Sequence, residues 1–211
     1  DTIDPGLLSG AQYRRATFIT VFGGGEGSFF NLLEIIPRLE PDMGGALMII
    51  IHQPEEHVNG FAEYLDSISA LKVVRAREGY HIEGGNCYIV SGHEYMGVKP
   101  YSAQLTLQKL NKSAAKGGTF DTLLASVSSV YKKRAAGIVL SGDEKDGDLG
   151  ISTLIENKGN GFILNTSECY CTGMTHHVME NCNIADCHSA GQLIQQIKDL
   201  HYQAKYGDMG V

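Results

Sequence analysis

The chain has no long basic run and no apolar stretch of membrane-spanning length. The formal net charge of its 211 residues is −7, whereas binding a phosphate backbone requires clustered Lys and Arg. The nearest candidate, Lys132-Lys133-Arg134, follows a helix pattern and is expected to interact with the carbonyl end of that helix. The apolar run 46–51 is only as long as a strand. We therefore expect neither nucleic-acid binding nor membrane insertion.

The sequence also lacks a Pro- or Ser-rich linker, an internal repeat, a starting methionine and a signal-peptide pattern. A hydrophobic content of 43% suits one core, so we expect a single domain over 16–205, between an N-terminal linker (1–15) and a C-terminal tail (206–211). We expect the chain to be a piece of a longer protein. Five cysteines, an odd number without the density of a disulfide scaffold, predict a reducing, cytoplasmic location.

Short apolar runs bounded by turn residues alternate with segments of helical periodicity. The expected strands cover residues 16–22, 46–51, 71–76, 86–91, 136–141 and 161–165. The expected helices cover residues 28–39, 57–68, 119–132, 148–157 and 189–204. The strands are apolar on both faces, which is typical of parallel strands covered by helices on each side. The pattern predicts an α/β fold with a single doubly wound, mainly parallel sheet and helices on both faces.

The middle of the chain departs from this alternation. Between residues 80 and 108, strand-like pieces follow one another without a helix, and we expect an antiparallel hairpin insertion there. The next segment, 109–118, holds three lysines and two glycines and is expected to be a mobile loop.

Candidate functional groups follow three of the expected strands. The turn 23–28 contains four glycines and joins a strand to a helix, so it leaves backbone N–H groups unpaired at a positive helix end. His52 comes directly after the strand 46–51, and the polar segment 141–147 follows another strand. Because the carboxyl ends of parallel strands meet at one edge of a sheet, we expect these groups to lie close together.

These segments resemble the catalytic domain of CheB, the protein-glutamate methylesterase of bacterial chemotaxis. The resemblance covers roughly residues 17–197, and five motifs carry it in the family's order. The family's motifs are a Gly-Ala-Ser-Thr-Gly-Gly turn, a strand-ending His before Pro and Phe-Ala, an Asp-Gly before Gly-His-Ala-Tyr-Ile-Ala-Pro-Gly, a Thr-Gly-Met-Gly-Asn-Asp-Gly loop and a Gly-Met-Pro. Their counterparts here are 23–28, His52-Gln53-Pro54 with Phe61-Ala62, Glu78-Gly79 with 85–92, 141–147, and Gly173-Met174.

The resemblance implies a role for each residue of the site. The family's serine nucleophile corresponds to Gly25, and the methionine that helps to form the oxyanion pocket corresponds to Asp143. His52 and Asp146 are retained as the base and the carboxylate that orients it. A family segment His-Arg-Pro-Ser-Val-Asp corresponds to 115–121, without its arginine or proline. Hydrolysis through an acyl-enzyme needs an attacking side chain, so we expect a degenerate, inactive member.

Two carboxylates, Glu26 and Asp143, are expected near the oxyanion position. In a pocket of low dielectric constant they would oppose developing negative charge by an energy on the order of several kcal/mol. The nearest hydroxyl is that of Ser28, which one helical turn places about 5 Å from Gly25, out of reach of a base positioned for the missing serine. We expect Ser28 to be a helix-terminal residue whose side-chain oxygen accepts backbone N–H groups.

Two interpretations remain open for His52. It is either a relic base bound to Asp146 or a core-edge residue whose ring nitrogens bind backbone carbonyls, and its place at a strand end favours the first. Asp146 precedes a helix, so its ordinary alternative role is to cap that helix, and the two roles can hold together.

Three other chemistries fit the sequence less well. The acidic run 143–148 lacks the alternating ligands of an EF-hand loop. The segment 169–188 holds seven Cys and His residues, but their spacing matches no zinc-finger or zinc-ribbon pattern. The turn 23–28 has neither the P-loop lysine nor a full Gly-x-Gly-x-x-Gly, and Glu26 would repel a phosphate. We expect no metal and no cofactor.

The resemblance therefore implies a non-catalytic domain of chemotaxis or two-component signalling. Its expected partner is a chemoreceptor or another signalling protein, and a receiver domain in the same polypeptide is a further expected neighbour. The alternative is an active methylesterase that uses Ser28, or a water activated by His52 and Asp146 in the gap left by Gly25.

Overall fold

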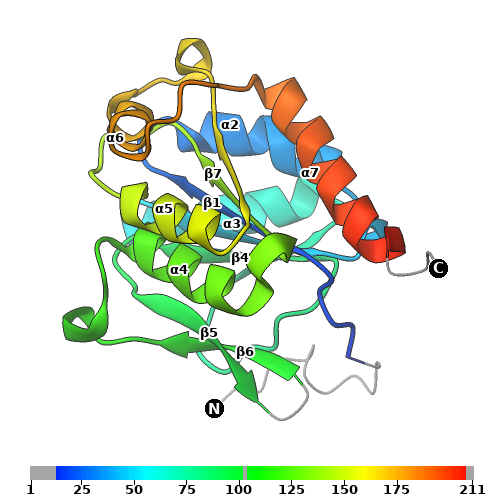
Figure 1. Ribbon diagram of the computed structural model, residues 1–211. Helices are drawn as coiled ribbons and strands as arrows, with labels where there is room; N and C mark the ends of the chain where they lie inside the picture. The colour runs from blue at the N-terminus through cyan, green and yellow to red at the C-terminus, as the bar shows by residue number, and fades with distance from the viewer. Residues whose placement is uncertain (1–12, 102–103, 208–211) are drawn as a thin grey trace.

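A computed structural model describes residues 13–101 and 104–207 (Figure 1). At its centre lies a six-stranded sheet in the order β3-β4-β2-β1-β7-β8, in which all neighbouring strands run parallel. The strands are β1 (Ile19–Gly24), β2 (Ala46–Ile51), β3 (Lys72–Arg75), β4 (Asn86–Ser91), β7 (Ala135–Val139) and β8 (Asn160–Ile163). The predicted α/β fold with a mainly parallel sheet is confirmed.

Helices cover both faces of the sheet (Figure 1). One face packs against α2 (Ser28–Ile35), α3 (Glu55–Ile68) and α7 (Ala190–Tyr206), and the other against α4 (Thr119–Tyr131), α5 (Asp148–Glu156) and α6 (Gly173–Cys182). Neighbouring residues of a strand point to opposite faces, so Phe22 joins the first core and Val21 the second, both fully buried. Burial on both faces explains why β2 is apolar at every position.

The antiparallel insertion predicted over 80–108 contains one hairpin, and residue 81 joins that hairpin through a single bridge to Thr106. Its two strands, β5 (Met96–Tyr101) and β6 (Gln104–Lys109), form a separate antiparallel sheet beside α4 (Figure 1). β4 falls within the predicted insertion but belongs to the parallel sheet, because it pairs with β2 on one side and β3 on the other.

Several element ends differ from their predicted positions, and the ends of β1 and α2 show the physical reasons. β1 extends beyond residue 22, because Gly23 and Gly24 still pair with Ile50 and Ile51 of β2. The helix predicted over 28–39 ends as an α-helix at Ile35. A 3-10 turn that contains Pro37, which has no N–H to donate, follows it.

α6 is absent from the predicted helices. Only Met174, Thr175 and Val178 of this helix are buried, so its apolar stripe is too narrow to stand out in the sequence. The segment 109–118 is irregular after the end of β6 apart from one 3-10 turn, Lys112–Ala114, and its mobility stays a prediction.

No described helix is both long enough and apolar enough to cross a bilayer. The linker predicted over 1–15 and the tail predicted over 206–211 fall largely outside the described residues, and α7 extends to Tyr206.

Candidate functional site

Three loops meet at the carboxyl edge of the sheet, after β1, β2 and β7. The backbone N–H of His52 donates to the carbonyl of Gly24 over 2.8 Å, and the N–H of Gly25 donates to the carbonyl of Ser141 over 2.8 Å. These bonds hold the glycine turn between the end of β2 and the β7–α5 loop. The structure therefore brings the groups after the three strands to one place.

His52 and Asp146 form a hydrogen-bonded pair, with 2.8 Å between Nε2 and Oδ2. Asp146 is 2% exposed and also accepts the backbone N–H groups of Phe120 and Asp121, each over 2.9 Å. Burial alone would raise the pKa of Asp146, but the hydrogen bonds from His52 and from these N–H groups lower it below its ordinary value. The carboxylate is therefore ionised near neutral pH, and its pairing with His52 favours the first interpretation of that histidine.

The alternative role of Asp146 as the cap of the following helix does not apply. That helix, α5, has Gly147 as its N-cap, with a left-handed φ of 111° that glycine tolerates. Asp146 instead closes the N-terminus of α4 through the N–H groups of Phe120 and Asp121. Asp121, in turn, closes the N-terminus of α5, because its Oδ1 accepts the N–H groups of Gly147 over 2.9 Å and of Gly150 over 2.7 Å. Each buried carboxylate thus closes the N-terminus of the helix beside the other.

In the described part of the chain, the His52 side chain hydrogen-bonds to Asp146 and to no hydroxyl or thiol, so no nucleophile is bound to its ring. Ser28 is fully buried in the first turn of α2, and its Oγ donates to the carbonyl of Gly25 over 2.6 Å. The predicted orientation of Ser28, in which its oxygen accepts backbone N–H groups, is therefore wrong. Its hydroxyl satisfies a carbonyl of the glycine turn instead.

Glu144, which the sequence reasoning missed, lies against Gly25. A Cβ atom built on Gly25 would overlap with Oε2 of Glu144 and lie 3.0 Å from its Cδ. The carboxylate of Glu144 thus fills the space in which a side chain at position 25 would begin. Glu144 stands at the second glycine of the family motif Thr-Gly-Met-Gly-Asn-Asp-Gly, and a charged residue at a motif glycine is the signal that could have found it.

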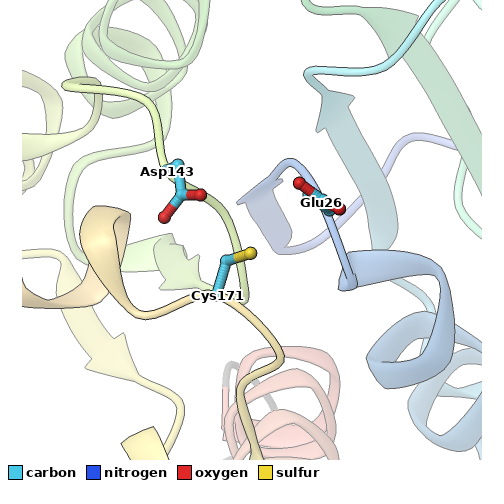
Figure 2. A group of neighbouring side chains, drawn as sticks. All are labelled: Glu26, Asp143 and Cys171. Atoms are coloured by element: carbon cyan, nitrogen blue, oxygen red, sulfur yellow. The ribbon is translucent and has the colours of Figure 1, made fainter.

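Glu26, Asp143 and Cys171 converge from three loops (Figure 2). Their carboxylate oxygens and the thiol sulfur all lie within 4.8 Å of one another. Both carboxylates are exposed, so water screens them and their effect at the oxyanion position is weaker than the low-dielectric prediction. Partial burial, together with the neighbouring Asp143 and Glu26, raises the pKa of the Cys171 thiol to about 11. The thiol is therefore protonated near neutral pH and would have to lose its proton to bind a metal.

The Cys- and His-rich segment 169–188 does not gather its own side chains into a cluster of metal ligands within the part of the chain described. Cys171 alone takes part in such a group, with Glu26 and Asp143.

Comparisons with known proteins agree with this architecture. Residues 20–197 match the family described as CheB methylesterase. A protein-glutamate methylesterase/protein-glutamine glutaminase of Pyrococcus horikoshii is 31% identical over 152 residues, which are 71% of this chain and 40% of that protein. A protein of the same name from Thermotoga maritima is 27% identical over 164 residues, 77% of this chain and 48% of that protein. The chain thus spans less than half the length of these two relatives.

The crystal structure of the Thermotoga maritima CheB methylesterase catalytic domain superposes on this chain with a TM-score of 0.79. The superposition covers 87% of this chain and 98% of that domain, at 24% sequence identity. At this identity the likeness establishes the fold.

Proposed function

Because this chain belongs to the CheB methylesterase family, we propose that it is a methylesterase-like domain of chemosensory or two-component signalling that binds a partner without hydrolysing an ester. The Glu144 carboxylate against Gly25 is the observation that carries the proposal. The position of the attacking group has no side chain, and a carboxylate fills the space in front of it. An ester carbonyl there would meet negative charge instead of a nucleophile.

The remaining base also has no hydroxyl bound to it in the described part of the chain. An ionised Asp146 holds Nε2 of His52 as a proton donor, so Nδ1 is the ring nitrogen left to accept a proton. Nδ1 lies beside Gly92, since a Cβ atom built on that glycine would overlap with it. A glycine at this place offers no hydroxyl, and the pair has a structural role in holding β2 against α4.

We propose a chemoreceptor or another signalling protein as the partner, with the domain acting in the cytoplasm. The two relatives described above are more than twice as long as the segments they share with this chain, which supports a neighbouring domain such as a receiver in the same polypeptide.

Methanol release from a receptor peptide that carries a glutamyl methyl ester tests the loss of hydrolysis. We expect the wild-type protein to release methanol no faster than buffer. Gly25→Ser is expected to stay inert, because the Glu144 carboxylate would lie against the new side chain and its charge would oppose the oxyanion even if the carboxylate moved aside. Gly25→Ser combined with Glu144→Gly, which restores the family's residues at both positions, is expected to release methanol above background.

Hydrolysis by the wild-type protein that His52→Ala abolishes would overturn the proposal. A folded double variant that stays inert would show that Glu144 is not the obstruction.

An active hydrolase is the second candidate, because the pair of His52 and Asp146 is intact at 2.8 Å and such a pair can activate a water. The structure favours water over Ser28 as the attacking group, since the Ser28 hydroxyl is buried and bound to the Gly25 carbonyl. Activity lost in His52→Ala and kept in Ser28→Ala would identify this mechanism.

A further inference from the structure

Asp121 and Asp146 are adjacent buried carboxylates that are 1% and 2% exposed. Asp146 accepts hydrogen bonds from Nε2 of His52 and from the backbone N–H groups of Phe120 and Asp121. Asp121 accepts hydrogen bonds from the backbone N–H groups of Gly118, Gly147 and Gly150. The Asp146 carboxylate thus touches the backbone of Asp121, and the Asp121 carboxylate touches the backbone of Gly147, the residue that follows Asp146.

The two groups differ in the partners that can carry charge. Among the described residues, no Lys or Arg side chain forms an ion pair with either carboxylate. Asp146 faces the His52 ring, whereas Asp121 has only neutral backbone donors besides Asp146 itself. Two buried carboxylates this close together do not both ionise readily, and these partners favour the charge on Asp146. Burial, followed by the charge of Asp146, raises the pKa of Asp121 to about 7.

Few other titratable groups reach this pair. Asp148, in the first turn of α5, directs its carboxylate to Nε2 of His177 over 3.1 Å. The Cys182 thiol of α6 faces both Asp121 and Asp148, and burial raises its pKa, so it is neutral near pH 7. No Lys or Arg side chain among the described residues supplies the positive charge that a second ionised carboxylate would need. The backbone N–H groups that Asp121 accepts lower its pKa, but burial and the charge of Asp146 outweigh them.

We propose that Asp121 is a positioning residue of the site, which shares one proton with Asp146 and thereby fixes the carboxylate that holds the His52 ring. The shared proton also joins the N-termini of α4 and α5, because each carboxyl group accepts N–H groups from the helix of the other. Loss of the proton would place two like charges between these helix ends and loosen the hold on His52. The inference concerns the order of the site and holds whether or not the protein hydrolyses esters.

Carbon-13 NMR of protein labelled at the aspartate carboxyl carbons tests the shared proton. We expect one aspartate signal to titrate with a midpoint near pH 7 in the wild type. Asp121→Asn should remove this step, because the amide offers a permanent donor to Asp146. Asp148→Asn is the matched control. It makes the same change of side chain in the first turn of α5, the helix end that Asp121 contacts, but the Asp148 carboxylate pairs with His177 and not with Asp146. The step should persist in that variant.

The Nε2–H resonance of His52 reports on positioning in the same samples. We expect it to shift across the same pH interval in the wild type and in Asp148→Asn, and to stay constant there in Asp121→Asn. Aspartate signals that all finish titrating below about pH 5 would overturn the proposal, as would a step that survives in Asp121→Asn. A His52 resonance that does not shift over the pH interval of the aspartate titration would refute the positioning role. If Asp121→Asn does not fold, the titration of the assigned Asp121 signal in the wild type still tests whether this carboxyl group keeps a proton up to about pH 7.

Discussion

Asp146 accepts three hydrogen bonds in a nearly solvent-free position, so its removal should weaken the fold as well as the site. Asp146→Ala would leave the N–H groups of Phe120 and Asp121 and the His52 ring without an acceptor. We expect the free energy of unfolding to fall by about 3 kcal/mol, as for other buried polar networks that lose one partner. Urea denaturation followed by circular dichroism measures the change. Asp186→Ala, which removes an exposed aspartate, should change stability by less than about 0.5 kcal/mol.

Asp121 should make stability depend on pH in the opposite direction from an ordinary salt-bridged aspartate. Its pKa rises from the ordinary 3.8 to about 7 on folding, so between these values the folded protein binds a proton that the unfolded chain releases. The stability from this proton is complete below about pH 4 and is lost as pH rises through about 7. Urea denaturation at pH 5 and pH 8 measures how far the free energy of unfolding falls between these two pH values. We expect this fall to be smaller in Asp121→Asn than in the wild type or in Asp148→Asn. Equal losses in all three proteins would contradict this expectation.

The sequence located the parts of the site that backbone position determines. His52 and Gly25 could be placed because each follows a strand, and parallel strands bring their ends together. Asp121 could not be given a role, because its partners other than Gly118 lie 25 or more residues away and depend on the packing of α4 against α5. Glu144 was missed for a similar reason, since only the folded loop turns its carboxylate toward Gly25.

Ser126 of α4 hydrogen-bonds to the hairpin of β5 and β6. Oγ of Ser126 accepts the N–H of Val98 over 2.9 Å and donates to the carbonyl of the same residue over 3.2 Å. Ser126→Ala removes both bonds, and the local opening free energy should fall by about 1 kcal/mol, which corresponds to roughly a five- to tenfold faster amide exchange at Val98. Ser129→Ala, on the same helix, removes a hydroxyl that bonds only within α4 and should leave exchange at Val98 unchanged. Equal exchange rates at Val98 in the two variants would refute this role for Ser126.

Elements were predictable where burial is extensive. β2 is buried at all six positions, and its uniform apolar sequence fits a strand covered on both faces. α6 buries only three residues and carries two histidines, a glutamate and an asparagine, so periodicity could not reveal it. The place of β4 in the parallel sheet also escaped the prediction of an insertion, because a strand's partners are set by the whole sheet and not by its neighbours in sequence.

The molecule has two cores that share one sheet. Val21 belongs to the core under α4, α5 and α6, and Phe22 to the core under α2, α3 and α7, so successive residues of β1 support both. Neither core can lose its packing without disturbing the strands on which the other rests. We therefore expect the described domain to unfold as one cooperative unit.

Phe22→Ala and Phe30→Ala test this cooperativity with the same change of side chain. Phe22 is fully buried and Phe30 is 72% exposed. Phe22→Ala should lower the free energy of unfolding by about 3–5 kcal/mol, whereas Phe30→Ala should change it by less than about 0.5 kcal/mol. Because both cores rest on β1, urea transitions followed by far-ultraviolet circular dichroism and by tyrosine fluorescence should coincide in the wild type and in both variants. Separate midpoints for the two probes in Phe22→Ala would mean that one core unfolds while the other persists.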